Sequence, residues 1–159
     1  MLKVLFLCTQ NSARSQMAEA ILNSKGDGRI KAFSAGSEPT ESIFSLIIPV
    51  MKDAGIDISD AKPKAIETFS NEDFDFVITL CDNARNQCPV FSSNAVHAHW
   101  GIADPRYIEG TDEEKFIQIK EIRNDLIRRI NLFLALPLEI ADKNMLKQSL
   151  NSILDNDNK

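Results

Sequence analysis

The sequence predicts an α/β fold in three layers, in which a parallel sheet of about four strands lies between helices on both faces. Short apolar runs alternate along the chain with longer segments in which apolar residues recur at helical spacing. In addition, residues 2–7 are almost continuously apolar, which is typical of a strand buried on both faces of a parallel sheet. Ligands of such sheets bind beyond the carboxyl ends of the strands.

The predicted strands cover residues 2–7, 29–36, 74–81 and 96–102. We expect a first helix from Ala13 to the glycines at 26 and 28, and a second over residues 43–54 with a kink or restart at Pro49. A long helix follows a capping signal at Thr111. It carries apolar residues on one face: Phe116, Ile119, Ile122, Leu126, Ile130 and Phe133.

Length and composition indicate one domain. The chain has 159 residues, of which 43% are hydrophobic, and this is enough for a single core without disulfides or structural metals. We place the domain at residues 1–136 and treat residues 137–159 as a C-terminal extension. Leu146, Leu150 and Leu154 recur there at helical spacing, so we expect a helix with a frayed end.

Charge and hydropathy exclude several kinds of partner. The net charge is −5 and charges of both signs are interspersed, so no basic patch predicts binding to nucleic acid or to an anionic membrane. No apolar run approaches the roughly 20 residues of a membrane-spanning helix, and the first apolar run is too short for a signal peptide. We therefore expect a soluble cytoplasmic protein.

The chain has three cysteines, Cys8, Cys81 and Cys88. An odd number without a secretion signal argues against a disulfide framework and leaves two interpretations, thiol chemistry or inert buried thiols. Their spacing relative to His97 and His99 does not resemble a zinc site, so we expect no metal.

The residues CTQNSARS follow the first strand and open the first helix, an arrangement typical of an oxyanion-binding loop. Its backbone amides and a bidentate Arg14 would hold a phosphate-like dianion and stabilise a thiolate at Cys8. We expect Ser15 to donate a hydrogen bond to the Cys8 sulfur and Asn11 to maintain the shape of the loop by hydrogen bonds to its own backbone. The other loop residues are Thr9, Gln10, Ser12 and Ala13. The alternative is a structural cysteine near a helix.

A thiolate that attacks an oxyanion needs an acid to protonate the departing oxygen. In the sequence WGIADPRY, Pro105 favours an extended conformation for Asp104, which would direct the carboxyl group over the cleft. The alternative is an ordinary Asp-Pro turn.

With these motifs the chain resembles the low-molecular-weight protein tyrosine phosphatase superfamily, in which a Cys-x5-Arg-Ser loop opens the chain and an Asp-Pro acid lies near its far end. Within that superfamily, CTQNSARSQMAE, FSAG, GIDIS, VITLCDNARNQCP and HWGIADP are similar to the thioredoxin-coupled arsenate reductases. The resemblance covers about residues 1–136, and the two distal cysteines make it specific.

The resemblance implies a reaction without a cofactor. Cys8 attacks arsenate held by the loop and Arg14, while Asp104 protonates the departing oxygen. Cys81 then attacks Cys8 and arsenite leaves. Cys88 carries the disulfide to a segment where thioredoxin or a similar dithiol reduces it.

Two other functions stay open, a low-molecular-weight phosphatase and a non-enzymatic thiol redox sensor. Cys81 and Cys88 would lie about 10 Å apart along an intact helix, whereas a disulfide needs Cα atoms within about 7 Å. The polar sequence DNARNQ between them would therefore have to loop out for a relay.

Some members of the superfamily bind potassium beside the loop. Asn11, Glu19 and Ser34 match that site, but Lys64 stands where an acidic ligand is expected, so its ammonium group would replace the cation. Gln10 and Ala13 stand where some relatives have glycine and a further cysteine.

Overall fold

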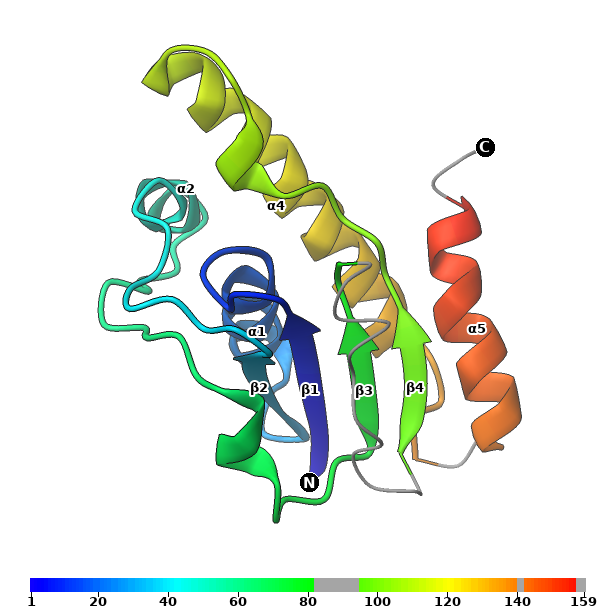
Figure 1. The fold of residues 1–159 in the computed structure, drawn as a ribbon. Helices are drawn as coiled ribbons and strands as arrows, with labels where there is room; N and C mark the ends of the chain where they lie inside the picture. Colours follow the sequence, from blue (N-terminus) through cyan, green and yellow to red (C-terminus); the bar gives the residue numbers. More distant parts are fainter. Residues whose placement is uncertain (82–94, 140–141, 157–159) are drawn as a thin grey trace.

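The centre of the molecule is a parallel sheet of four strands in the order β2-β1-β3-β4 (Figure 1). This is a computed structural model, which describes residues 1–81, 95–139 and 142–156. The strands are β1 (Leu2–Cys8), β2 (Ile30–Gly36), β3 (Phe76–Thr79) and β4 (Val96–His99). The predicted parallel α/β fold is confirmed. The last two strands are shorter than predicted, because the chain leaves the sheet after Leu80 and Trp100 have donated their N–H groups to Leu7 and Thr79.

The central strand β1 is buried on both faces, as its continuous apolar sequence predicts. Val4 and Phe6 point into the larger hydrophobic core, while Leu5 and Leu7 point into a smaller core on the opposite face. This alternation is the two-residue period of a strand. The strand is therefore held between two layers, and its last residue, Cys8, lies at the carboxyl edge of the sheet.

Among the described residues, four helices share the core that contains Val4 and Phe6. They are α1 (Arg14–Lys25), α4 (Asp112–Leu134), α5 (Lys143–Asn156) and the shorter α2 (Ile47–Asp53). The helix α2 packs against α4 (Figure 1). In the described residues the opposite core is covered by η1, the 3-10 helix Ile66–Phe69, together with Phe33 and Phe74.

Helix starts agree with the predictions except in one place. Thr111 caps α4 by accepting a hydrogen bond from the N–H of Glu114, as expected. The second helix begins at Ile47 rather than at residue 43, because the N–H of Phe44 donates to Ser12 of the oxyanion loop. Pro49 then falls in the first turn of α2, where a backbone N–H has no helical acceptor, so it neither kinks nor restarts the helix.

The helix α5 lies beside β4, the last strand in the order of the sheet (Figure 1). It buries Leu146, Leu150 and Ile153 in the larger core, and the Trp100 indole donates to the Leu150 oxygen at 3.0 Å. In the part of the chain that the structure describes, no helix combines the length and the apolar character needed to cross a membrane.

Candidate active site

The loop from Thr9 to Ala13 joins the end of β1 to the start of α1. Three of its carbonyl oxygens are held by N–H groups of the segment that follows β2. The pairs are Glu38 to Thr9 at 2.8 Å, Thr40 to Gln10 at 3.3 Å and Phe44 to Ser12 at 2.8 Å. With these carbonyl groups held from one side, the amides of the loop can face an anion at Cys8, helped by the amino end of α1.

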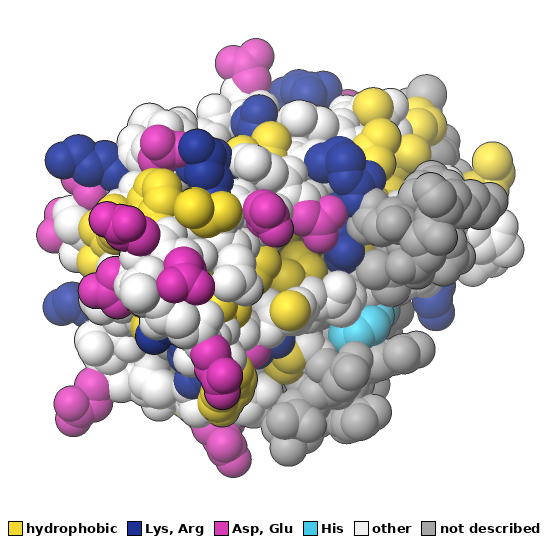
Figure 2. Space-filling model, turned by 90° about the horizontal axis from the view of Figure 1, so that it is seen from above, with side chains coloured by type: hydrophobic (Ala, Val, Ile, Leu, Met, Phe, Trp, Pro, Cys, Tyr) yellow, Lys and Arg dark blue, Asp and Glu magenta, His cyan; other side chains and the backbone are white. Residues whose placement is uncertain are grey.

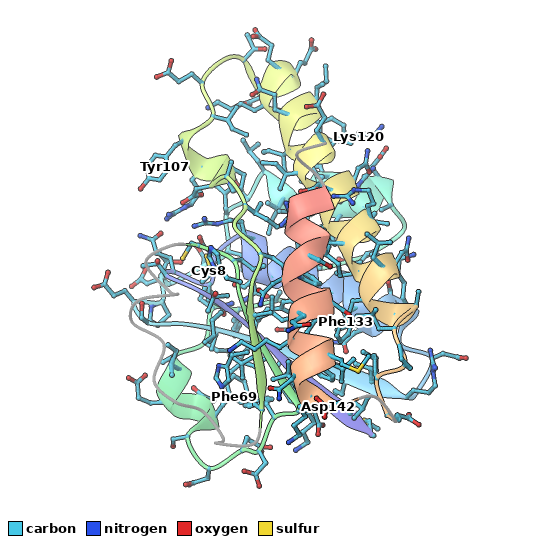
Figure 3. The ribbon with its side chains drawn as sticks, turned by 90° about the vertical axis from the view of Figure 1, so that its right-hand side faces the viewer. Cys8, Phe69, Tyr107, Lys120, Phe133 and Asp142 are labelled. Carbon is cyan, nitrogen blue, oxygen red and sulfur yellow. The ribbon has the colours of Figure 1, made fainter. Side chains whose placement is uncertain are left out.

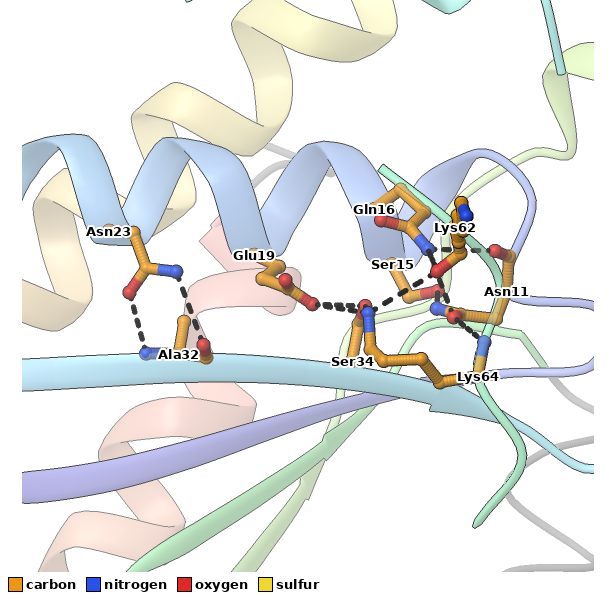
Figure 4. A network of polar contacts seen from close by, with 9 residues as sticks. All are labelled: Asn11, Ser15, Gln16, Glu19, Asn23, Ala32, Ser34, Lys62 and Lys64. Atoms are coloured by element: carbon orange, nitrogen blue, oxygen red, sulfur yellow. Dashed lines mark hydrogen bonds and ion pairs between the residues drawn. The ribbon is translucent and has the colours of Figure 1, made fainter. Parts of the chain in front are cut away.

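Asn11 fixes the turn of this loop through its side chain (Figure 4). Its φ of 51° lies in the left-handed region, which asparagine tolerates better than most residues. The amide nitrogen donates to Ser15 Oγ at 2.7 Å, and the amide oxygen accepts from the backbone N–H of Lys64 at 2.8 Å and from Gln16 Nε2 at 3.0 Å. Asn11 thus maintains the loop through neighbouring segments rather than through its own backbone.

The expected hydrogen bond from Ser15 to Cys8 is not formed in the structure. Among the described residues, Ser15 Oγ has Asn11 Nδ2 as its hydrogen-bond partner. Because this buried hydroxyl accepts from the Asn11 amide, Ser15 helps to hold the shape of the loop.

Cys8 and Cys81 lie together at the carboxyl ends of the neighbouring strands β1 and β3. Neither forms a disulfide, they are 3% and 7% exposed, and both belong to the smaller hydrophobic core. Thr9 Oγ1 lies 3.1 Å from Cys81 Sγ, so the loop that surrounds Cys8 also holds the second sulfur.

The pKa of the Cys8 thiol is raised by its hydrogen bond with Cys81 and by burial, which outweigh the lowering effect of the Arg14 charge. The sequence predicts a stabilised thiolate from Arg14 and the helix end, whereas the contact with Cys81 and burial act on the pKa of Cys8 in the opposite direction. Because the two thiols are neighbours, the ionisation of one of them affects the pKa of the other.

Asp104 faces Arg14 across the site. Its backbone is extended, with φ −77° and ψ 116°, as expected for a residue before proline. Arg14 Nη2 lies 3.2 Å from Asp104 Oδ2, and Arg14 Nη1 donates to the Ile102 oxygen at 3.0 Å. Arg106 also binds the carboxylate, with Nη2 2.6 Å from Oδ2. Burial raises the pKa of Asp104, but hydrogen bonds from Arg106 and the charge of Arg14 outweigh it and leave the pKa below its usual value.

A cavity of about 400 Å³ opens over these groups. It is lined by Thr9, Gln10, Arg14, Glu38, Cys81, Asp104, Arg106 and Tyr107. Figure 3 shows Cys8 and Tyr107 on the same side of the molecule. Among the described residues, the buried Nε of Arg14 has no hydrogen-bond partner. A buried guanidinium donor without a partner is costly, so it marks a place for an acceptor such as an oxyanion.

Lys64 lies where the sequence places it, beside Glu19 and Ser34 (Figure 4). Its ammonium nitrogen is 3.4 Å from Glu19 Oε2 and 3.5 Å from both Ser34 Oγ and the Lys62 oxygen, and Ser34 also donates to Glu19. Lys64 is therefore within reach of three oxygens. Within residues 1–81, 95–139 and 142–156, no group of three or more His, Cys, Asp or Glu side chains is placed to hold a metal ion.

The structure thus brings together Cys8, Arg14, Cys81 and Asp104, whereas Cys88 lies outside the described residues. Sequence reasoning missed three residues of the site, Gln16, Gly36 and Arg106. Gln16 is 2% exposed and ties Asn11 to the Lys62 oxygen, and the signal was a polar residue on the buried face of α1. Arg106 is a cation two positions after Asp104. Gly36 lies against the loop, and nothing in its local sequence announces that contact.

Comparisons with known proteins agree with this geometry. Residues 3–143 match the family described as low molecular weight phosphotyrosine protein phosphatase. An arsenate reductase of Halalkalibacterium halodurans is 38% identical over 130 residues, which are 82% of this chain and 93% of that protein. A glutaredoxin arsenate reductase of Synechocystis is 36% identical, over 82% of this chain and 100% of that protein.

Solved structures give the same result. An arsenate reductase in the phosphate binding state superposes with a TM-score of 0.71 at 32% identity, covering 85% of this chain and 98% of that one. A thioredoxin-dependent arsenate reductase of Corynebacterium glutamicum gives a TM-score of 0.60 at 29% identity, covering 83% of this chain and 63% of that one. From the extent of the family match and the identity to the curated relatives, the chain belongs to the low molecular weight phosphotyrosine protein phosphatase family.

Proposed function

We propose that the protein reduces arsenate to arsenite, with Cys8 as the nucleophile and with Cys81 and Cys88 as the thiols that carry away the oxidation. The observation that carries this proposal is the contact between Cys8 and Cys81 at the oxyanion loop. A phosphatase that returns its covalent adduct to water needs one thiol, whereas a reductase needs a second thiol within reach of the first. The similarity to arsenate reductases supports the same conclusion.

In the first step the loop amides and Arg14 hold arsenate against Cys8. The Cys8 sulfur attacks arsenic, and Asp104 protonates the departing oxygen, which leaves as water. Because the pKa of Cys8 is raised in the free protein, the thiol must lose its proton when the substrate binds. The entering dianion is a base that can take it.

In the second step Cys81, as a thiolate, attacks the Cys8 sulfur. The sulfur–arsenic bond breaks and its electron pair stays on arsenic, which is reduced from arsenic(V) to arsenic(III) and leaves as arsenite. The two sulfurs become a disulfide. Thr9, in hydrogen-bond contact with Cys81 Sγ, holds the attacking sulfur beside its target.

In the third step Cys88 attacks Cys81, restores Cys8 and leaves a disulfide between Cys81 and Cys88. The part of Cys88 rests on the sequence. A dithiol protein of the thioredoxin type then reduces this disulfide by exchange. We place the reaction in the cytoplasm, because a relay that begins with free thiols needs a compartment that keeps thiols reduced.

The test is arsenate-dependent oxidation of NADPH in the presence of thioredoxin and thioredoxin reductase. The wild type should turn over, while Cys8→Ser, Cys81→Ser and Cys88→Ser should each fall to background. A parallel assay with glutaredoxin, glutathione and glutathione reductase identifies the reductant. Normal turnover by all three serine variants would exclude the relay.

A phosphatase is the second candidate, and it is favoured by Tyr107, which is 76% exposed and lines the same cavity as Arg14. An aromatic side chain there can stack on the ring of an aryl phosphate. Steady hydrolysis of an aryl phosphate without arsenate reduction would favour this function. Inactivity towards both substrates, with a disulfide-dependent change in conformation, would favour a redox sensor.

A further inference from the structure

Two arginines compete for one carboxylate in this site. Arg106 approaches Asp104 with four contacts, from the backbone N–H at 3.0 Å, from Nε at 3.1 and 3.2 Å, and from Nη2 at 2.6 Å. Arg14 reaches the same Oδ2 from the other side at 3.2 Å. The carboxylate therefore carries one more guanidinium than its single charge requires.

Arg106 is also placed to meet an anion. It lines the cavity together with Arg14, Gln10 and Cys81. Its guanidinium lies over the ring of Tyr107, with 5.3 Å between Cζ and the ring centroid, and its side chain is 21% exposed. An arginine in this position keeps a rigid fork of donors at the mouth of the oxyanion site.

We propose that Arg106 is a second oxyanion-binding guanidinium, which is held on Asp104 in the free protein and transfers to the oxyanion when the oxyanion binds at Cys8. The inference rests on the proposed function for the location of the oxyanion, but it does not depend on the thiol relay.

Charge and geometry favour the transfer. A phosphate-like dianion between Arg14 and Arg106 offers twice the charge of the Asp104 carboxylate and oxygens suited to bidentate contact. Arg14 and Arg106 are the two cationic side chains in the described lining of the cavity, and Glu38 is its second carboxylate besides Asp104. The guanidinium that leaves Asp104 exchanges one charge-assisted contact for another of the same kind.

The transfer has a consequence for Asp104. In the free protein the Arg106 contacts and the Arg14 charge hold the Asp104 carboxyl in its ionised form. Once a dianion has drawn both guanidinium groups towards itself, the carboxylate has lost cations and gained an anionic neighbour, so it binds a proton more readily. Asp104 then becomes an acid only when a substrate is present.

The test is a double-mutant cycle on the affinity for inorganic phosphate, measured by calorimetry on the reduced full-length protein. The four proteins are the wild type, Arg106→Gln, Asp104→Asn and the double variant. In the Asp104→Asn background Arg106 is free for phosphate, so removing Arg106 should weaken binding there by about tenfold or more. In the wild-type background the same change should weaken binding less, because Arg106 must first leave Asp104.

The cycle separates direct binding from simple neutralisation of Asp104. If Arg106 served only to neutralise that carboxylate, Arg106→Gln would leave phosphate affinity unchanged once Asp104 is asparagine, and this result would overturn the proposal. Arg128→Gln removes the same charge from the exposed surface of α4 and should change affinity little in either background. Circular dichroism of each variant confirms folding. If Arg106→Gln left the phosphate affinity unchanged in both backgrounds while the wild type reduced arsenate, this inference would be rejected and the proposed function would stand.

Discussion

Cys8 and Cys81 lie side by side at the carboxyl edge of the sheet, and the interaction with Cys81 is the largest influence that raises the pKa of Cys8. The raised pKa favours the protonated form of Cys8 in this arrangement. In the proposed reaction the same contact would place Cys8 beside the thiol that attacks it in the second step.

Replacing Cys81 should make the Cys8 thiol more reactive. In Cys81→Ala the thiol partner is gone while Arg14 remains, so the pKa of Cys8 should fall. Alkylation of Cys8 by iodoacetamide at neutral pH should then be about tenfold faster or more, as followed by peptide mass spectrometry across a pH series. Cys88→Ala removes one thiol as well but leaves the Cys8–Cys81 contact in place. Equal acceleration in both variants would contradict the assigned cause.

Adding a methyl group at Gly36 should distort the oxyanion loop. A Cβ there would lie 2.6 Å from the Thr9 oxygen and 2.9 Å from the Asn11 nitrogen, and both are backbone atoms that cannot swing aside. Gly36→Ala should weaken phosphate binding by about 10- to 100-fold, as measured by calorimetry. In Gly28→Ala the new methyl group meets open space at a φ of 77°. That control should lose about 1 kcal/mol of stability and keep its phosphate affinity.

Restoring an acidic side chain at position 64 should create a response to potassium. In Lys64→Asp the ammonium group no longer occupies the space beside Glu19 and Ser34, and a carboxylate joins their oxygens. At about five times the dissociation constant, potassium should add about 1 kcal/mol to the free energy of unfolding. Thermal unfolding in potassium chloride and in choline chloride measures this. The wild type and Lys62→Asp, altered at an exposed neighbour, should respond equally to the two salts.

Truncating Leu150 should destabilise the protein through the contact between α5 and the core. This side chain is fully buried, so Leu150→Ala should lower the free energy of unfolding by about 2–5 kcal/mol. Met145 lies on the same helix and is 65% exposed, and Met145→Ala should stay within about 0.5 kcal/mol of the wild type. Denaturant titrations followed by the fluorescence of Trp100, the single tryptophan, report both. Equal losses would mean that α5 is not docked as described.

The parts of the fold that were predictable are those with a local cause. The apolar run of β1 and the cap at Thr111 act within a few residues, and the loop between Cys8 and Arg14 is defined by its own spacing. The early start predicted for the second helix was wrong, because Phe44 bonds to Ser12 in a distant segment. Propensity along the chain cannot report such a contact.

The site shows the same division. Cys8, Arg14 and Asp104 could be named from their neighbours in sequence, but the Arg106 contact with Asp104 and the approach of Gly36 to the loop depend on folded geometry. The sequence indicates a lowered pKa for Cys8 from Arg14 and the helix end, whereas in the folded protein the contact with Cys81 and burial raise it.

Charges of both signs are interspersed on the face at the carboxyl ends of the strands (Figure 2). The positive charges that face the cavity are therefore local, and they come from Arg14 and Arg106 rather than from the surface as a whole. Binding of small oxyanions should accordingly depend weakly on ionic strength compared with binding that relies on a broad basic surface.

The place of α5 beside β4 has a consequence for the behaviour of the protein at high concentration. An edge strand with free N–H groups is a template on which a strand of another molecule can add, and that is a common start of aggregation. Here Asn151 of α5 accepts a hydrogen bond from the His99 N–H at 3.2 Å, and the helix lies along the strand. The helix α5 thus covers the outer edge of the sheet, so that a strand of another molecule cannot easily pair with β4.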